Sequence, residues 1–276
     1  MDDKIIAIFA ICSDFLMTIR HYEDPQTRMN DAEVMTTAIV AMLFFGGNFE
    51  SARDLLQAPQ YMPDMLSKSR FNRRLHRVKP LFVTLFSLLG EHWKELNADS
   101  IYLIDTFPVA ACDNYRIARC HLYRGERYRG YIASKRRYFY GLKIHLVVTQ
   151  AGQPVEFFLT AGAESDVGCL ELFDLDVPEG SEVYADRAYN DYLLEDIYQE
   201  AEIDFQPLRK KNSKRPYPPW QTYWIQLHRK MIETVGSLIE QRLPKHIHAV
   251  TAVGFELKVV LFILAHSIDC VFKVAT

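Results

Sequence analysis

The chain has 276 residues, 49% of them hydrophobic and 24% charged, which is typical of a folded protein and excludes disorder as its main state. Its net charge of −3 gives no overall attraction to nucleic acid. The start Met1-Asp2-Asp3-Lys4 does not fit a secretory signal. The longest apolar runs, Ala38 to Phe45 and Val259 to Ala265, are shorter than the roughly 20 residues that cross a bilayer. A cytoplasmic protein without a membrane partner is therefore expected.

Helical spacing of apolar residues dominates the N-terminal part of the chain. One apolar face runs from Ile5 to Ile19 and a second from Asp31 to Phe45, where Gly46-Gly47 is expected to end the helix. A further amphipathic helix is expected from Leu81 to Leu96. These segments predict an all-helical N-terminal region.

A short basic helix is expected within this region. Ser67 or Ser69 is placed to cap it, and it runs to about Lys79 with three apolar residues on its inner side, Phe71, Leu75 and Val78. A compact helical region with one basic helix is typical of a DNA-binding head. Residues 1–98 are therefore predicted to be a helical DNA-binding region.

From Ile101 onward the pattern changes to strands. The apolar run 101–104 ends in Asp105, residues 138–149 alternate as in a half-buried strand, and residues 155–160 return after the turn Ala151-Gly152-Gln153-Pro154. These three runs predict a β-meander.

The remaining segments alternate between helix and strand, and a basic loop separates them from two final helices. The expected elements are a helix capped by Ser165-Asp166, a strand from Glu182 to Ala185 that ends in Asp186, a helix from about Tyr192 to Ala201, a strand from Ile203 to Leu208, the loop Arg209 to Pro219, and helices from Trp220 to Leu243 and from Val250 to Phe272. Together with the meander, this order predicts an α/β fold in which helices flank a mixed sheet.

Basic residues form three clusters although the total charge is negative. Six lie between Lys68 and Lys79, nine between Asn114 and Lys143 against the single acid Glu126, and five between Arg209 and Arg215. Local clusters of this kind can neutralise phosphates, which favours DNA or RNA over a merely solvated surface. The predicted DNA contacts are Arg70, Arg73, Arg74, Arg77, Lys135, Arg136, Arg137, Arg209, Lys210, Lys211 and Arg229.

Asp105 and Asp186 share one setting, since each is expected to close an apolar strand and to precede a loop. Open α/β sheets bind ligands at such strand ends. Two neighbouring carboxylates repel each other unless a proton or a metal lies between them. Mg²⁺ binds through one or two carboxylates while keeping positions for water and phosphate, and such sites catalyse phosphoryl transfer. Mg²⁺, with Mn²⁺ as a substitute, is therefore the predicted cofactor.

A later helix offers the third acid of such a site. The expected helix 220–243 carries Glu233 and Glu240, which are seven residues apart and so lie on similar faces.

Four motifs in order then make a family recognisable: Tyr102-Leu103-Ile104-Asp105-Thr106-Phe107-Pro108-Val109, Tyr138-Phe139-Tyr140-Gly141-Leu142-Lys143, Tyr184-Ala185-Asp186-Arg187-Ala188-Tyr189-Asn190-Asp191 and Arg229-Lys230-Met231-Ile232-Glu233. The set resembles DDE transposases of bacterial insertion sequences, most closely the insertion-sequence 982 group. The resemblance covers essentially the whole chain.

This resemblance implies a ribonuclease-H-like catalytic domain over residues 99–276, dependence on Mg²⁺, and double-stranded DNA as the partner of a homodimer. It implies hydrolysis at the ends of the element, followed by strand transfer into target DNA. Asp105 matches the family's first acid and Asp186 its second.

The third acid departs from the pattern of related families, which carry tyrosine, arginine, glutamate and lysine on the last catalytic helix. Arg229 and Glu233 keep the central spacing, but Gln226 replaces the tyrosine and Glu240 the lysine. Glu233 is therefore the preferred third acid and metal ligand, with Glu240 as the alternative.

Simpler roles exist for several of these residues. Asp105 can cap a turn at residues 106–108, Asp186 can cap the following helix, and Arg229 can pair with Glu233 or hold a phosphate. Capping also explains Asp166, charge balance explains Asp113, and His145 is expected to be a hydrogen-bonded histidine of the sheet.

Two alternatives to a transposase remain open. One is a nuclease or resolvase with the same core that hydrolyses DNA without joining it. The other is a catalytically inactive DNA-binding remnant, against which the pair Asp105 and Asp186 argues.

Overall fold

The computed structural model describes residues 1–132, 135–170, 175–244 and 247–274. By internal packing the chain forms two compact units, one of residues 1–88 with 239–276 and one of residues 89–238. The division runs through two helices, α5 and α8. It groups residues 239–276 with the N-terminal helices, whereas the sequence pattern predicts that they belong to the catalytic region.

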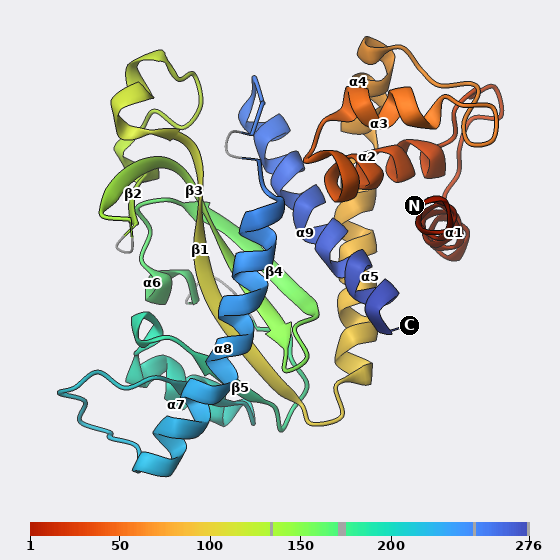
Figure 1. The fold of residues 1–276 in the computed structure, drawn as a ribbon. Coiled ribbons are helices and arrows are strands. Elements are labelled where there is room, and N and C mark those ends of the chain that lie inside the picture. The colour runs from red at the N-terminus through yellow and green to blue at the C-terminus, as the bar shows by residue number, and fades with distance from the viewer. Residues whose placement is uncertain (133–134, 171–174, 245–246, 275–276) are drawn as a thin grey trace. The chain divides into compact units, whose positions relative to one another are not determined.

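The first unit is helical within its described residues (Figure 1). Its elements are α1 (Asp2–Thr18), α2 (Asp31–Phe45), α3 (Phe49–Leu56), α4 (Lys68–Arg77), the first part of α5 (Lys79–Leu96) and α9 (Ala252–Val274). Helix α2 begins with a capping box of Asn30 and Glu33 and ends at Gly46, whose φ of 54° is left-handed. The predicted helices are thus confirmed, but α3, which Asn48 caps, was not predicted.

The basic helix α4 follows Ser67, and its predicted inner residues Phe71, Leu75 and Val78 are buried. Arg74 lies on the same helix but points to acids of its own unit. It forms ion pairs with Glu23 at 2.7 Å and with Asp31, and its side chain is only 20% exposed.

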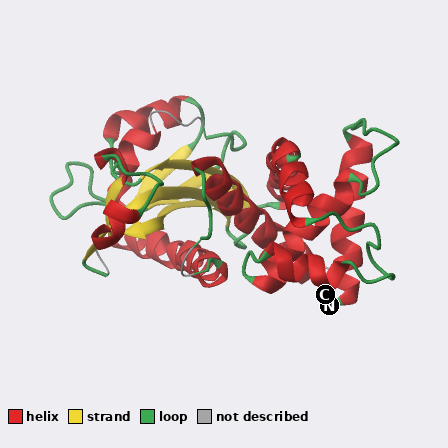
Figure 2. Ribbon diagram, turned by 90° about the horizontal axis from the view of Figure 1, so that it is seen from above, coloured by secondary structure: helices red, strands yellow, loops and turns green. Residues whose placement is uncertain are grey.

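The second unit contains a six-stranded mixed sheet in the order β2-β3-β1-β5-β6, with β4 paired to β3. Its strands are β1 (Ile101–Asp113), β2 (Arg129–Ile132), β3 (Arg137–Thr149), β4 (Pro154–Ala161), β5 (Glu182–Ala185) and β6 (Asp204–Pro207). Strand β1 is antiparallel to β3 and parallel to β5, and β5 is parallel to β6. Figure 2 shows helices on both faces of this sheet. The arrangement is that of a ribonuclease-H-like fold, as predicted.

Strands β1, β3 and β4 form the predicted meander, but β1 is longer than expected. It continues through Asp105 to Asp113, with Thr106, Phe107 and Pro108 all paired to β3. The expectation that Asp105 closes its strand and caps a turn is therefore wrong. The reason is that β3 extends past the short partner β5 and keeps β1 extended after the parallel pairing ends.

Helices α6 (Asp166–Leu170), α7 (Tyr192–Glu200) and α8 (Pro219–Arg242) accompany the sheet. Helix α8 lies along it, because His228 stacks on Tyr184 of β5 at 5.0 Å and Gly236 lies against Phe107 of β1. Helix α5 packs closely on β4, where a side chain at Gly90 would lie 2.3 Å from the carbonyl oxygen of Val155. Only glycine fits at that contact.

Among the described helices, none is by itself long and apolar enough for a membrane span. Only α2 and α3 taken together pass that test, and they are bent by 113° at their junction.

Candidate active site

The register of two parallel strands brings Asp105 and Asp186 together. Ile104 of β1 pairs with Ala185 of β5, and each aspartate is the next residue on its strand. Asp186 leaves the strand and starts the 3-10 turn η3 (Arg187–Tyr189), whereas Asp105 stays within β1. The two acids, 81 positions apart in the sequence, are therefore neighbours at the point where β5 ends.

Strand alternation directs Asp105 to the face covered by α8, and Asp186 lies at the same helix through its ion pair with Arg229. Phe107, two residues after Asp105, contacts Gly236, and Tyr184, two residues before Asp186, stacks on His228. Side chains two apart along a strand share a face. This face is where α8 presents Arg229 and Glu233.

Arg229 connects the second aspartate to the glutamate of α8. Its guanidinium lies 3.3 Å from a carboxylate oxygen of Asp186 and 3.4 Å from one of Glu233. The arginine side chain is 15% exposed, and its buried Nε has no hydrogen-bond partner. The guanidinium of Arg229 thus forms ion pairs with two carboxylates.

Asp105 belongs to the same electrostatic cluster. The pKa of Asp105 is raised to about 6, chiefly by burial and in addition by the nearby charges of Asp186 and Glu233, against the opposing effects of a hydrogen bond from the Thr106 amide and the charge of Arg229. The amide bond to its Oδ1 is 2.8 Å long. The structure therefore brings together Asp105, Asp186, Glu233 and Arg229. Glu240, the alternative third acid, lies in the part of α8 that belongs to the first unit.

The donor set fits a hard divalent cation. Three carboxylates share the positive charge of Arg229, and the raised pKa of Asp105 shows that this charge does not fully offset burial and mutual repulsion. Carboxylate oxygens are the ligands that Mg²⁺ prefers. Within the described ranges, no three acidic, histidine or cysteine side chains are close enough to form a metal cage, and the ion pairs of Arg229 join the acids instead.

A buried polar network supports the two aspartates from the opposite face of β1. The hydroxyl of Thr106 lies 2.9 Å from His145 Nδ1 and also bonds the hydroxyl of Tyr189, the last residue of η3. His145 Nε2 lies 2.9 Å from Thr160 Oγ1, and its ring stacks on Phe158 at 4.3 Å. This network ties the turn after Asp186 to the strand that carries Asp105.

His145 is neutral in this network. Its side chain is fully buried, and burial together with Lys143 lowers its pKa to about 3. The prediction of a hydrogen-bonded sheet histidine is confirmed. Thr106 and Tyr189 were not among the predicted site residues, although both lie within the quoted motifs, Thr106 directly after Asp105 and Tyr189 three residues after Asp186.

Two other acids have partners of their own. Asp166 is the first residue of α6 and lies 3.0 Å from Lys143 Nζ, while Ser165 caps the helix through the amide of Gly168. Asp113 lies 3.3 Å from Arg137, which confirms the predicted charge balance.

The predicted DNA contacts differ in exposure. Those exposed are Arg70, Arg73, Arg77, Lys135, Arg136, Arg137, Lys210 and Lys211, of which Arg137 also pairs with Asp113. Arg209, in contrast, is 11% exposed and pairs with the carboxylate of Glu195 at 2.8 Å, and Arg74 pairs with Glu23 and Asp31. These two arginines hold their own unit together.

In a comparison with protein families, residues 95–248 match the family model described as the transposase DDE domain. Comparisons with curated proteins and with solved structures give no significant match. The matched segment spans more than half of the chain and includes Asp105, Asp186 and Glu233. The chain therefore belongs to the DDE transposase family.

Proposed function

We propose that this protein is an insertion-sequence transposase, of the insertion-sequence 982 group, that cuts DNA at the ends of its element and joins those ends to target DNA. Asp105, Asp186 and Glu233 are the proposed catalytic acids. The observation that carries this proposal is the parallel register of Ile104 and Ala185, which makes the two aspartates neighbours opposite the Arg229–Glu233 pair of α8.

The same three carboxylates would hold the divalent metal, Mg²⁺ or Mn²⁺ in its place. Such an ion, when bound, lowers the pKa of water and stabilises the charge on attacking and leaving oxygens. Arg229 has a planar guanidinium suited to a phosphate group, so it would leave its carboxylates to contact the scissile phosphodiester. Asp105 must be ionised to act as a ligand.

The reaction has two balanced steps. In hydrolysis, a water oxygen forms a bond to phosphorus and the bond to the 3′-oxygen breaks, which leaves a 3′-hydroxyl on the element. In strand transfer, that 3′-oxygen forms a bond to a target phosphorus, and the 3′-oxygen of the target leaves. The acids position both nucleophiles, since orientation supplies much of the rate acceleration.

Residues 1–98 are the proposed DNA-binding region and residues 99–276 the catalytic domain, which acts as a homodimer on two DNA ends. Exposed basic residues of α4 and of the loop after β6 would contact the phosphate backbone, chiefly Arg70, Arg73, Arg77, Lys210 and Lys211. Backbone contacts of this kind position the protein without reading sequence.

The test incubates purified protein with labelled element ends and a target plasmid, with Mg²⁺ or with a chelator. Wild-type protein should give cut and joined products only with metal, and Asp105→Asn should give neither. Cut ends without joined products would favour the nuclease alternative, and full cleavage by Asp105→Asn would refute the catalytic assignment. Asp113→Asn is the matched control, because Asp113 lies on the same strand but pairs with Arg137.

A further inference from the structure

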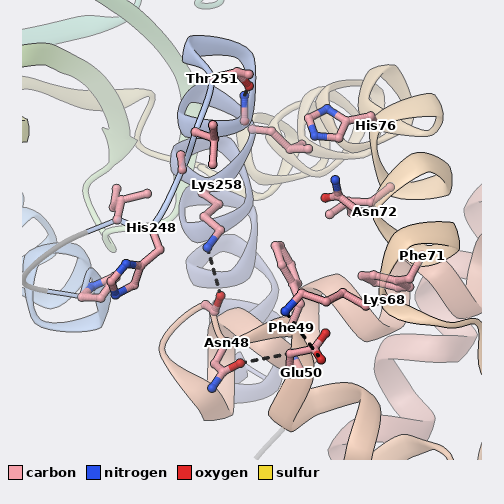
Figure 3. Close-up of a pocket in the computed structure, with 18 of the residues that line it drawn as sticks. Asn48, Phe49, Glu50, Lys68, Phe71, Asn72, His76, His248, Thr251 and Lys258 are labelled. Atoms are coloured by element: carbon pink, nitrogen blue, oxygen red, sulfur yellow. Dashed lines mark hydrogen bonds and ion pairs between the residues drawn. The ribbon is translucent and has the colours of Figure 1, made fainter. Parts of the chain in front are cut away.

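The helical unit contains a cavity of about 960 Å³ that shares no residue with the acid cluster (Figure 3). Its walls come from the segment at the end of α2, from α3 and α4, and from the segment that leads into α9. Its volume is at the upper end of the range for sites that hold small organic molecules, about 300–1,000 Å³.

Lys258 of α9 places a cationic group in this cavity. Figure 3 shows its side chain extended toward the loop at Gly47, whose carbonyl oxygen lies 3.4 Å from Nζ. Burial lowers the pKa of Lys258, and its contacts among the described residues are the carbonyl oxygen of Gly47 and the ring of Phe49, neither of which is an anion. A half-buried ammonium without an anion is costly, and a bound anion would offset that cost.

Further hydrogen-bond donors line the same cavity. They are Lys68, Asn72 and His76 of α4, with His248 and Thr251 before α9. The acid in the lining, Glu50, is already held by Arg53 at 2.7 Å and lies 3.9 Å from Lys68, so its charge is offset. The cavity therefore offers an anion several donors and little repulsion.

An apolar wall faces these donors. Phe49 and Phe71 have ring centroids 5.9 Å apart, and Leu75 and Leu257 lie beside them. Lys258 Nζ lies 5.1 Å from the centre of the Phe49 ring. Cationic donors next to an aromatic wall suit a ligand that carries both a phosphate and a flat ring.

This cavity is on a different side of α4 from the exposed arginines. Helical periodicity places Lys68 and Asn72 on one side, and Arg70, Arg73 and Arg77 on the other. A ligand in the cavity would thus be held independently of DNA on the outer face of α4.

We propose that this cavity binds a nucleotide, through phosphate contacts to Lys258 and Lys68 and ring contacts to Phe49. The nucleotide is either free or one unit of a DNA strand, and the two sources share the same chemistry. The proposal goes beyond the transposase reaction and does not require it.

The test measures binding of deoxyadenosine monophosphate and of a short single-stranded oligonucleotide by calorimetry. Lys258→Met should lower affinity for the bound probe about tenfold or more, because a charge-assisted hydrogen bond is lost, and Lys258→Arg should retain most of it. Asn72→Ala, at an exposed position that should tolerate the change, should lower affinity about threefold. Lys4→Met is the control, because it removes a lysine of the same unit outside the cavity.

Lys258-dependent binding of the mononucleotide would identify a free nucleotide, and such binding of the oligonucleotide alone would identify a DNA strand. The proposal would be overturned if neither probe bound. It would also be overturned if Lys258→Met and Asn72→Ala both bound as tightly as wild type, or if inorganic phosphate bound as tightly as the nucleotide probes. The lining of the cavity shares no residue with the acid cluster, so a failure of the transposase assignment would leave the Lys258-dependent part of the binding intact.

Discussion

The guanidinium of Arg229 lies 3.3 Å from the carboxylate of Asp186. The same group lies 3.4 Å from Glu233, so one arginine holds a strand-end acid and a helix acid together. Its side chain is 15% exposed, whereas Asp186 and Glu233 are 38% and 59% exposed.

Arg229→Gln should lower the free energy of unfolding in a chelator by about 1 kcal/mol, because Asp105, Asp186 and Glu233 then repel one another without a cation, although water screens the two more exposed acids. Addition of Mg²⁺ should recover more stability in this variant than in wild type, since binding to the folded state stabilises it. Urea titrations with and without Mg²⁺ measure both effects. Equal Mg²⁺ effects in the two proteins would show that Arg229 does not compensate the acids.

Glu233→Gln should lower the rate of DNA cleavage about 100-fold or more, because loss of a metal ligand removes several kcal/mol of transition-state stabilisation. Glu240→Gln, seven residues further along α8, is the matched control and should cleave at a rate close to wild type. A labelled-end cleavage assay compares the two. The reverse order would make Glu240 the third acid.

Asp105→Asn should stabilise the protein above pH 6. The pKa of Asp105 is raised from 3.8 to about 6 in the folded state, so between these values the folded protein binds more protons than the unfolded chain and wild-type stability falls as pH rises. The asparagine variant does not lose stability in this way, so at pH 7.5 its free energy of unfolding should exceed that of wild type by at most about 3 kcal/mol. Urea titrations at pH 4.5 and 7.5 measure the gain, and a variant no more stable than wild type at pH 7.5 would contradict the prediction.

His145→Gln should remove a part of the pH dependence of stability that is opposite in sign to that of Asp105. The pKa of His145 falls to about 3 on folding, so below pH 6.5 the unfolded chain binds the extra proton and wild-type stability is lost as pH falls. This loss should reach about 2 kcal/mol at pH 5. The variant should show a smaller decrease between pH 7 and pH 5 in the same titrations, and an unchanged decrease would exclude His145 as its source.

The double variant Lys210→Ala/Lys211→Ala should weaken DNA binding and reduce the magnitude of the slope of log affinity against log salt by about 1–2. The reason is that the variant contacts fewer phosphates, and binding therefore releases fewer counterions from the DNA. Both lysines are exposed, so the thermal stability of the double variant should match wild type. Arg209→Ala should instead cost about 3 kcal/mol of stability, since it leaves Glu195 buried without its partner. Fluorescence anisotropy over a salt series tests the first result, and an unchanged slope would rule out the lysines as contacts.

Local patterns were enough to predict much of this molecule. The apolar periodicity of α1, α2 and α5 and the alternation along β3 gave the helices and the meander, because side-chain spacing follows directly from backbone geometry. The ordered motifs pointed to Asp105, Asp186 and Glu233. The short helix α3 and strand β2 were not predicted.

The sequence alone determined the family of the chain and the candidate acids, because residue types and their order along the polypeptide are sufficient to define both. Tertiary structure decided which of these groups meet. Pairing with β3 keeps Asp105 inside a strand, the register with β5 sets it beside Asp186, and the approach of α8 adds Arg229. Contacts between residues far apart in the chain depend on strand pairing and packing, and no local pattern encodes those directly.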